Sequence, residues 1–190
     1  MAAIAEASVQ PDPWYEPGSR GQLSVRTIMN LLGPCINPAR PPVQLLGVAD
    51  PRMLRRIAET LDATGVTEAL VVHGSGLDEV ALHGETLAVR LSNGEISQFV
   101  MSPEDAGLER APLSVVAGGD PAENATRLRN LLEGTASKAE TDITILNAAA
   151  LLYTAGKAGT LKDAAVKARD VLQSGKAAKV LDAYIEASRD

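Results

Sequence analysis

The chain has one cysteine, no long apolar run and no leader-like N-terminus, and each of these shortages excludes a class of protein. The single cysteine, Cys35, cannot form an internal disulfide, which suits a reducing cytoplasm. No apolar run reaches the roughly 18 residues that span a bilayer. The N-terminus has neither the basic start nor the apolar stretch of a signal peptide. We therefore expect a cytoplasmic protein that does not act in a membrane.

Positive charge and aromatic side chains are also scarce. The chain carries 18 Lys and Arg against 24 Asp and Glu, a net charge of -6, which argues against binding to nucleic acid or to an anionic membrane surface. Aromatic residues make up 3% of the 190 residues, whereas 45% are hydrophobic. This composition predicts a single folded unit with a sizeable core of aliphatic side chains.

The N-terminal region differs in character from the rest of the chain. Residues 1–21 hold three prolines and are predicted to be an irregular lead-in. Residues 22–40 are predicted to form a short helical arm and hinge, and residues 41–190 an α/β domain. The arm presents an apolar set that nothing upstream covers, so we expect it to pack on another copy of the chain, on a missing partner or back on the domain. That set comprises Val25, Ile28, Met29, Leu31 and Leu32.

A strand–helix–strand unit gives the strongest indication of the fold. Residues 44–49 are predicted to be a buried strand, a helix begins at Asp50 and Pro51, and residues 68–72 form a second buried strand. Such a unit is typically a right-handed parallel crossover. We therefore predict an α/β fold with a mainly parallel sheet flanked by helices.

The second half of the chain is predicted to be a hairpin followed by helices. Asn93-Gly94 favours a tight turn between strands at 86–91 and 95–101, and residues 111–117 are expected to add another strand. Helices follow, because caps and apolar residues at helical spacing recur to the end of the chain. The expected helices span 120–134, 141–155, 160–174 and 176–187.

Two adjacent acids, Asp78 and Glu79, are the candidate metal ligands. They follow the apolar strand 69–72 and a bend that contains Gly74 and Gly76. After such a bend both carboxylates can face one hard cation, which prefers oxygen ligands and often shares them with a phosphate. Loops at the carboxyl ends of parallel strands are where open α/β sheets bind ligands. The alternative is that the pair belongs to an ordinary solvated loop.

Other chemically capable residues are predicted to have structural roles. Gly118-Gly119-Asp120 is interpreted as a helix start, because Asp120 would repel a phosphate. His73 is expected to be hydrogen-bonded within the fold, and His83 to be exposed without a partner. Asn147, in an alanine-rich helix, is expected to form a helix–helix hydrogen bond. Cys35 is expected to be a small buried hydrophobe, since no His or cation lies beside it in sequence.

Several separate motifs, in the same order and with similar spacing, make this chain resemble anthranilate phosphoribosyltransferases. The resemblance covers residues 22–188 and only the C-terminal half or so of that family. The motifs are RTIMNLLGP at 26–34, NPA at 37–39, QLLGV at 44–48, VHG and LDE within 72–79, GGDPAEN at 118–124 and LNAAA at 146–150.

The resemblance implies a glycosyltransferase of tryptophan biosynthesis. Its reaction moves phosphoribosyl from phosphoribosyl pyrophosphate to anthranilate and releases pyrophosphate, with Mg²⁺ bridging the pyrophosphate to Asp78 and Glu79. The nucleophile belongs to the substrate, so the protein itself needs no catalytic nucleophile. The family's helical domain forms its dimer contact, which implies a homo-oligomer.

The resemblance also shows what this sequence does not contain. The family's phosphate-binding Gly-Thr-Gly-Gly-Asp loop and its Asn-x-Ser-Thr and Lys-His-Gly-Asn segments do not occur here. The family arginine that contacts anthranilate falls in the stretch that residues 1–21 replace. We therefore expect a fragment, a truncated product or one half of a split enzyme, inactive as an isolated chain. A non-catalytic α/β remnant or interaction module is the alternative.

Overall fold

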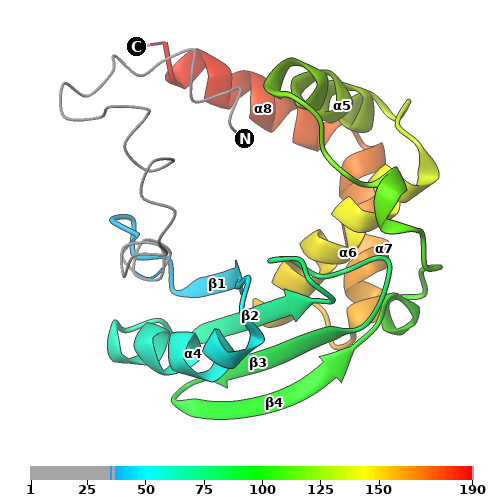
Figure 1. Ribbon diagram of the computed structural model, residues 1–190. Coiled ribbons are helices and arrows are strands. Elements are labelled where there is room, and N and C mark those ends of the chain that lie inside the picture. Colours follow the sequence, from blue (N-terminus) through cyan, green and yellow to red (C-terminus); the bar gives the residue numbers. More distant parts are fainter. Residues whose placement is uncertain (1–34, 36, 190) are drawn as a thin grey trace, which may run out of the picture.

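The computed structural model describes residue 35 and residues 37–189, so the predicted lead-in and most of the predicted arm lie outside the described residues (Figure 1). Short 3-10 helices occupy Pro51–Met53, Pro103–Ala106 and Leu113–Val115. The strands and longer helices follow in the order β1 (Val43–Gly47), α4 (Leu54–Ala63), β2 (Glu68–Gly74), β3 (Thr86–Ser92), β4 (Glu95–Met101), α5 (Pro121–Glu133), α6 (Lys138–Thr154), α7 (Leu161–Gln173) and α8 (Lys176–Ala187).

The strands form one sheet in the order β1-β2-β3-β4. The α/β class is confirmed, and β1 and β2 are parallel on either side of the α4 crossover, with Leu45 opposite Leu70. The sheet is nevertheless mixed and not mainly parallel, since β2–β3 and β3–β4 are antiparallel. The predicted hairpin explains one of these pairs. Asn93 and Gly94 have φ angles of 48° and 85°, and so tight a connection can only join antiparallel strands.

Helices cover both faces of the sheet: α4 lies on one side, and α6 and α7 lie on the other (Figure 1). Alternate residues of β2 therefore enter different cores. Ala69 and Val71 pack with the buried face of α4, whereas Leu70 and Val72 pack with α6. The result is a three-layer arrangement in which the carboxyl ends of β1 and β2 lie between the two helical layers.

The helix boundaries follow their caps. Asp120 accepts a hydrogen bond from the Glu123 N–H at 2.8 Å, as a structural helix start requires. Helix α6 begins three residues earlier than predicted, because Ser137 and Glu140 form a reciprocal capping box. The strand expected at 111–117 is wrong. That segment bonds locally as a 3-10 turn, in which the Val115 N–H donates to the Pro112 carbonyl.

A buried carboxylate joins α6 to α7. Asp142 is 2% exposed and receives Lys138 Nζ at 2.7 Å and Arg169 Nη2 at 3.1 Å. Two cations thus compensate one buried charge, which would otherwise be costly. Helix α8, by contrast, buries none of its residues. Among the described residues, no helix is long and apolar enough to cross a membrane.

Candidate functional site

The two candidate acids lie just beyond the carboxyl end of β2. The chain reverses at Ser75 and Gly76, whose φ angles of 48° and 99° are those of a tight hairpin turn. Gly74 and Leu77 close the turn with reciprocal backbone hydrogen bonds of 2.9 and 3.0 Å. Asp78 and Glu79 follow and are both exposed. The sequence therefore predicted the bend and its position, although only one of the two glycines forms the turn itself.

Two glycines at the strand ends make room for the backbone of the acidic pair. A Cβ atom on Gly47, the last residue of β1, would lie 1.5 Å from the carbonyl oxygen of Asp78. A Cβ atom on Gly74, the last residue of β2, would lie 2.3 Å from the carbonyl oxygen of Glu79. Neither glycine has a positive φ, so close approach accounts for both. The role of Gly47 was not predicted from the sequence. The signal that could have indicated it is a glycine at the end of an apolar strand.

The residues after the acidic pair are held from α6 and from β3. Asn147 accepts a hydrogen bond from the Val80 N–H at 2.9 Å and donates to the Val80 carbonyl at 3.0 Å. Thr86, which is fully buried, accepts from the Ala81 N–H at 3.0 Å. The helix–helix hydrogen bond predicted for Asn147 is therefore wrong. Its partner is a loop 67 residues away, which a single sequence gives no means to identify.

Both histidines stabilise the turn. His73 Nδ1 lies 2.9 Å from the Val48 carbonyl and must donate to it, so Nε2 accepts from the Gly76 N–H at 3.3 Å. The structural role predicted for His73 is confirmed. His83 is half-buried, and its Nε2 donates to the Ser75 carbonyl at 3.1 Å. The prediction of an exposed His83 without a partner is wrong, because the segment 80–84 folds back beneath the turn.

The electrostatics of the acidic pair favour a cation. Partial burial raises the pKa of the Glu79 carboxyl, and the neighbouring Asp78 carboxylate raises it further. A divalent ion would relieve this repulsion and lower that pKa again. The part of the chain that is described contains no cluster of three or more His, Cys, Asp and Glu that would hold a metal ion. Two carboxylates alone would leave most of the coordination shell of an ion such as Mg²⁺ to water and phosphate.

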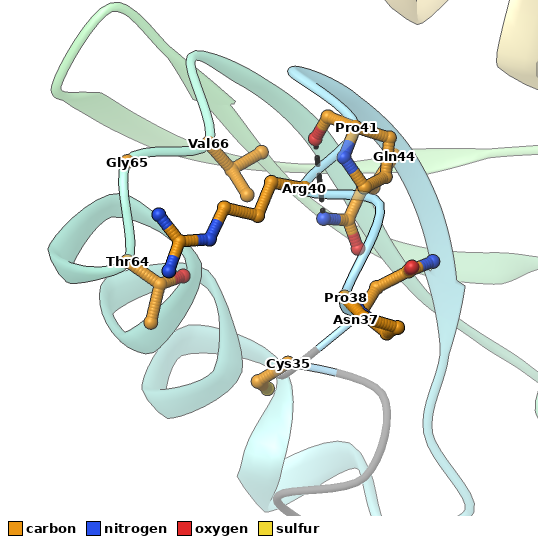
Figure 2. Close-up of a pocket in the computed structure, with 9 residues that line it drawn as sticks. All are labelled: Cys35, Asn37, Pro38, Arg40, Pro41, Gln44, Thr64, Gly65 and Val66. Atoms are coloured by element: carbon orange, nitrogen blue, oxygen red, sulfur yellow. Dashed lines mark hydrogen bonds between the residues drawn. The ribbon is translucent and has the colours of Figure 1, made fainter.

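A hollow of about 420 Å³ lies at the opposite end of the strands, where β1 and β2 begin. Figure 2 shows the side chain of Arg40 extending toward Thr64 and Gly65 at the carboxyl end of α4. A cation there offsets the partial negative charge of a helix C-terminus. Cys35 also lines the hollow; it is buried, as predicted, and burial raises the pKa of its thiol. We assign this hollow no ligand.

Comparison with known proteins places the chain in a family. Residues 14–178 match the model of the glycosyl transferase family, a/b domain. The anthranilate phosphoribosyltransferase of Sorangium cellulosum is 47% identical over 171 residues, which are 90% of this chain and 49% of that protein. The chain thus spans about half the length of such relatives.

Solved structures agree with this placement. Anthranilate phosphoribosyltransferase from Thermus thermophilus superposes with a TM-score of 0.81 at 42% identity, over 90% of this chain and 50% of that one. The Saccharomyces cerevisiae enzyme in complex with PRPP and Mg gives a TM-score of 0.79 at 29% identity, over 89% and 49%. The expected resemblance is confirmed, and the chain belongs to the glycosyl transferase family, a/b domain.

Proposed function

We propose that this chain forms the magnesium- and pyrophosphate-binding part of an anthranilate phosphoribosyltransferase, with Asp78 and Glu79 as the metal ligands. The observation that carries the proposal is the position of two adjacent exposed carboxylates just beyond the carboxyl ends of a parallel strand pair, where Gly47 and Gly74 admit their backbone. That the related yeast enzyme was solved with PRPP and Mg supports the same ligands here. The single buried cysteine fits a cytoplasmic enzyme.

In this proposal the protein positions groups and balances charge. Magnesium, when bound, would neutralise the negative charge that grows on the departing pyrophosphate. Asp78 and Glu79 would hold the ion at the strand ends, and the turn at Ser75-Gly76 would keep their backbone in place. The attacking amine would come from anthranilate, so no side chain of this chain serves as a nucleophile.

The alternative is a non-catalytic α/β remnant or interaction module. The absence of Gly-Thr-Gly-Gly-Asp from the sequence favours it, because positioning of the phosphoribosyl group would be lost. A split enzyme is a third possibility. Mixing this chain with the remaining half of a close relative, expressed separately, distinguishes them: regained transfer supports a split enzyme, and no transfer supports a remnant.

Magnesium is expected to bind weakly alone and about 10- to 100-fold more tightly when pyrophosphate is present. Two carboxylates leave most of an octahedral shell to water, which Mg²⁺ gives up reluctantly, whereas phosphate oxygens supply further ligands. Calorimetry of magnesium binding with and without pyrophosphate measures this coupling. NMR shifts of residues 73–80 report where the ion binds.

Charge-matched variants control this experiment. Asp78→Asn with Glu79→Gln should abolish the coupling, whereas Asp182→Asn with Glu186→Gln removes the same charge from the exposed face of α8 and should not alter it. Magnesium and pyrophosphate also bind each other in solution, so each variant receives the same titrations and only differences from the unmodified chain count. Equal coupling in both double variants would show that the acidic pair belongs to a solvated loop.

Self-association is expected as well, with a second copy of the chain as the partner. Val180 and Tyr184 lie one turn apart on α8 and are 69% and 59% exposed. The apolar residues of the predicted arm add to this tendency. Sedimentation velocity over a wide concentration range should show species larger than a monomer, and fewer of them after Val180→Ser with Tyr184→Ser. A monomer at every concentration would contradict the expectation.

A further inference from the structure

Asn147 places a polar amide in the half-buried middle of α6. All three hydrogen bonds of that amide are made to backbone groups. Oδ1 accepts from the Val80 N–H, and Nδ2 donates to the carbonyls of Val80 and Ile143 at 3.0 and 3.1 Å. The pair of bonds to Val80 imitates the pairing of two strands. A helix side chain thus holds both polar backbone groups of the residue that follows Glu79.

Each residue of the segment 78–81 has its backbone in close contact with, or hydrogen-bonded to, another element. The Asp78 and Glu79 carbonyls lie where Gly47 and Gly74 have no side chain, Val80 is bound by Asn147, and the Ala81 N–H donates to the buried Thr86. The backbone therefore has little freedom, although the side chains of Asp78 and Glu79 are exposed. Such support is typical of sites whose ligands must keep a fixed geometry.

Apolar packing alone would keep this segment in place if covering the core were its only role. Val80, Ala81 and Leu82 are 1%, 0% and 0% exposed, and Val80 and Leu82 already anchor the segment in the core shared with α6 and α7. Apolar packing is not directional, however, whereas Asn147 bonds the N–H of the Glu79–Val80 peptide and the carbonyl of the Val80–Ala81 peptide, and so restrains the orientation of both. The first of these peptides directly follows Glu79, so its orientation bears on where the Glu79 side chain leaves the backbone.

We propose that Asn147 is a positioning residue for the Asp78–Glu79 pair and that its two bonds to Val80 determine how strongly magnesium and pyrophosphate bind together. The inference rests on the proposed function. Asn147 does not itself contact the ion. It acts as the outer partners of metal ligands do, whose removal typically lowers affinity about 10- to 100-fold.

The test measures magnesium–pyrophosphate coupling in the full chain and in variants of α6. Asn147→Leu keeps the bulk of the side chain but removes both bonds to Val80, and it should lower the coupling about 10-fold. Asn147→Ser gives the same test with a milder change, because a serine hydroxyl can still bond the Ile143 carbonyl within the helix but is too short for Val80. Thr154→Ala is the matched control, since it deletes a buried hydrogen bond of the same helix to Ala150.

Hydrogen exchange of the Val80 amide adds a readout that needs no ligand. It should speed up in both Asn147 variants and stay slow in Thr154→Ala. Reduced coupling together with faster Val80 exchange supports the proposal. Normal coupling in a folded Asn147→Ser or Asn147→Leu chain overturns it while leaving the proposed function intact. Absence of coupling in the unmodified chain overturns both.

Discussion

Replacing Gly47 with alanine is expected to destabilise the fold by about 3 kcal/mol and to abolish the magnesium–pyrophosphate coupling. The new methyl group would lie 1.5 Å from the Asp78 carbonyl oxygen and 2.2 Å from the carbonyl carbon. Backbone atoms cannot move aside as the end of a flexible side chain can, so the acidic segment must shift. Urea unfolding measures the loss of stability, and calorimetry of magnesium binding with and without pyrophosphate measures the coupling.

Gly159 provides the matched control for this substitution. An added Cβ there meets nothing within 4 Å, and the residue has no positive φ. Gly159→Ala should change the free energy of unfolding by less than about 0.5 kcal/mol and leave the coupling intact. A Gly47→Ala chain with unchanged stability and unchanged coupling would show that the backbone of Asp78 does not cross the end of β1.

No phosphoribosyl transfer above background is expected from the isolated chain, a loss of about five orders of magnitude or more relative to an intact enzyme. The sequence contains none of the three family segments that complete the phosphoribosyl pyrophosphate site. In the proposed function the acidic pair would hold an ion, but it would not by itself align the reacting carbon with the amine. A steady-state assay with anthranilate, phosphoribosyl pyrophosphate and magnesium measures the effect.

The informative variant in that assay is Asp78→Asn. Any turnover seen with the unmodified chain must fall to the level of a protein-free blank in this variant, or the activity comes from a contaminant. Turnover that exceeds the blank and disappears with Asp78→Asn would contradict the expectation. It would mean that residues within this chain supply positioning that the family draws from other segments.

Local signals in the sequence predicted most of the fold. Asp120 and Gly134 bound α5 as cap residues should, and Asn93-Gly94 forms the expected hairpin turn. These features depend on residues close together in the chain. The antiparallel pairing of β2 with β3 depends on which strands meet in space, and so does the exclusion of residues 113–115 from the sheet. Apolar periodicity does not encode that information.

The candidate site divides in the same way. The turn before Asp78 was predictable, because the apolar residues 69–72 and the two glycines Gly74 and Gly76 are local features. The supports of the acidic segment were not, since Gly47, Thr86 and Asn147 come from three different elements. Only the folded chain brings them around the same backbone. The backbone position of an exposed loop thus depends on residues that are distant in the sequence.

The buried carboxylate of Asp142 links the helical layer to the acidic pair through α6. Arg169 of α7 pairs with Asp142 of α6 and so joins the two helices, while Lys138 pairs with the same carboxylate from within α6. The acidic segment touches the sheet through the two glycines and touches α6 through Asn147. Its position is therefore expected to depend on the distance between the sheet and α6. We therefore expect a buried substitution in α7 that displaces α6 to shift the backbone of Asp78 and Glu79 without contacting either residue.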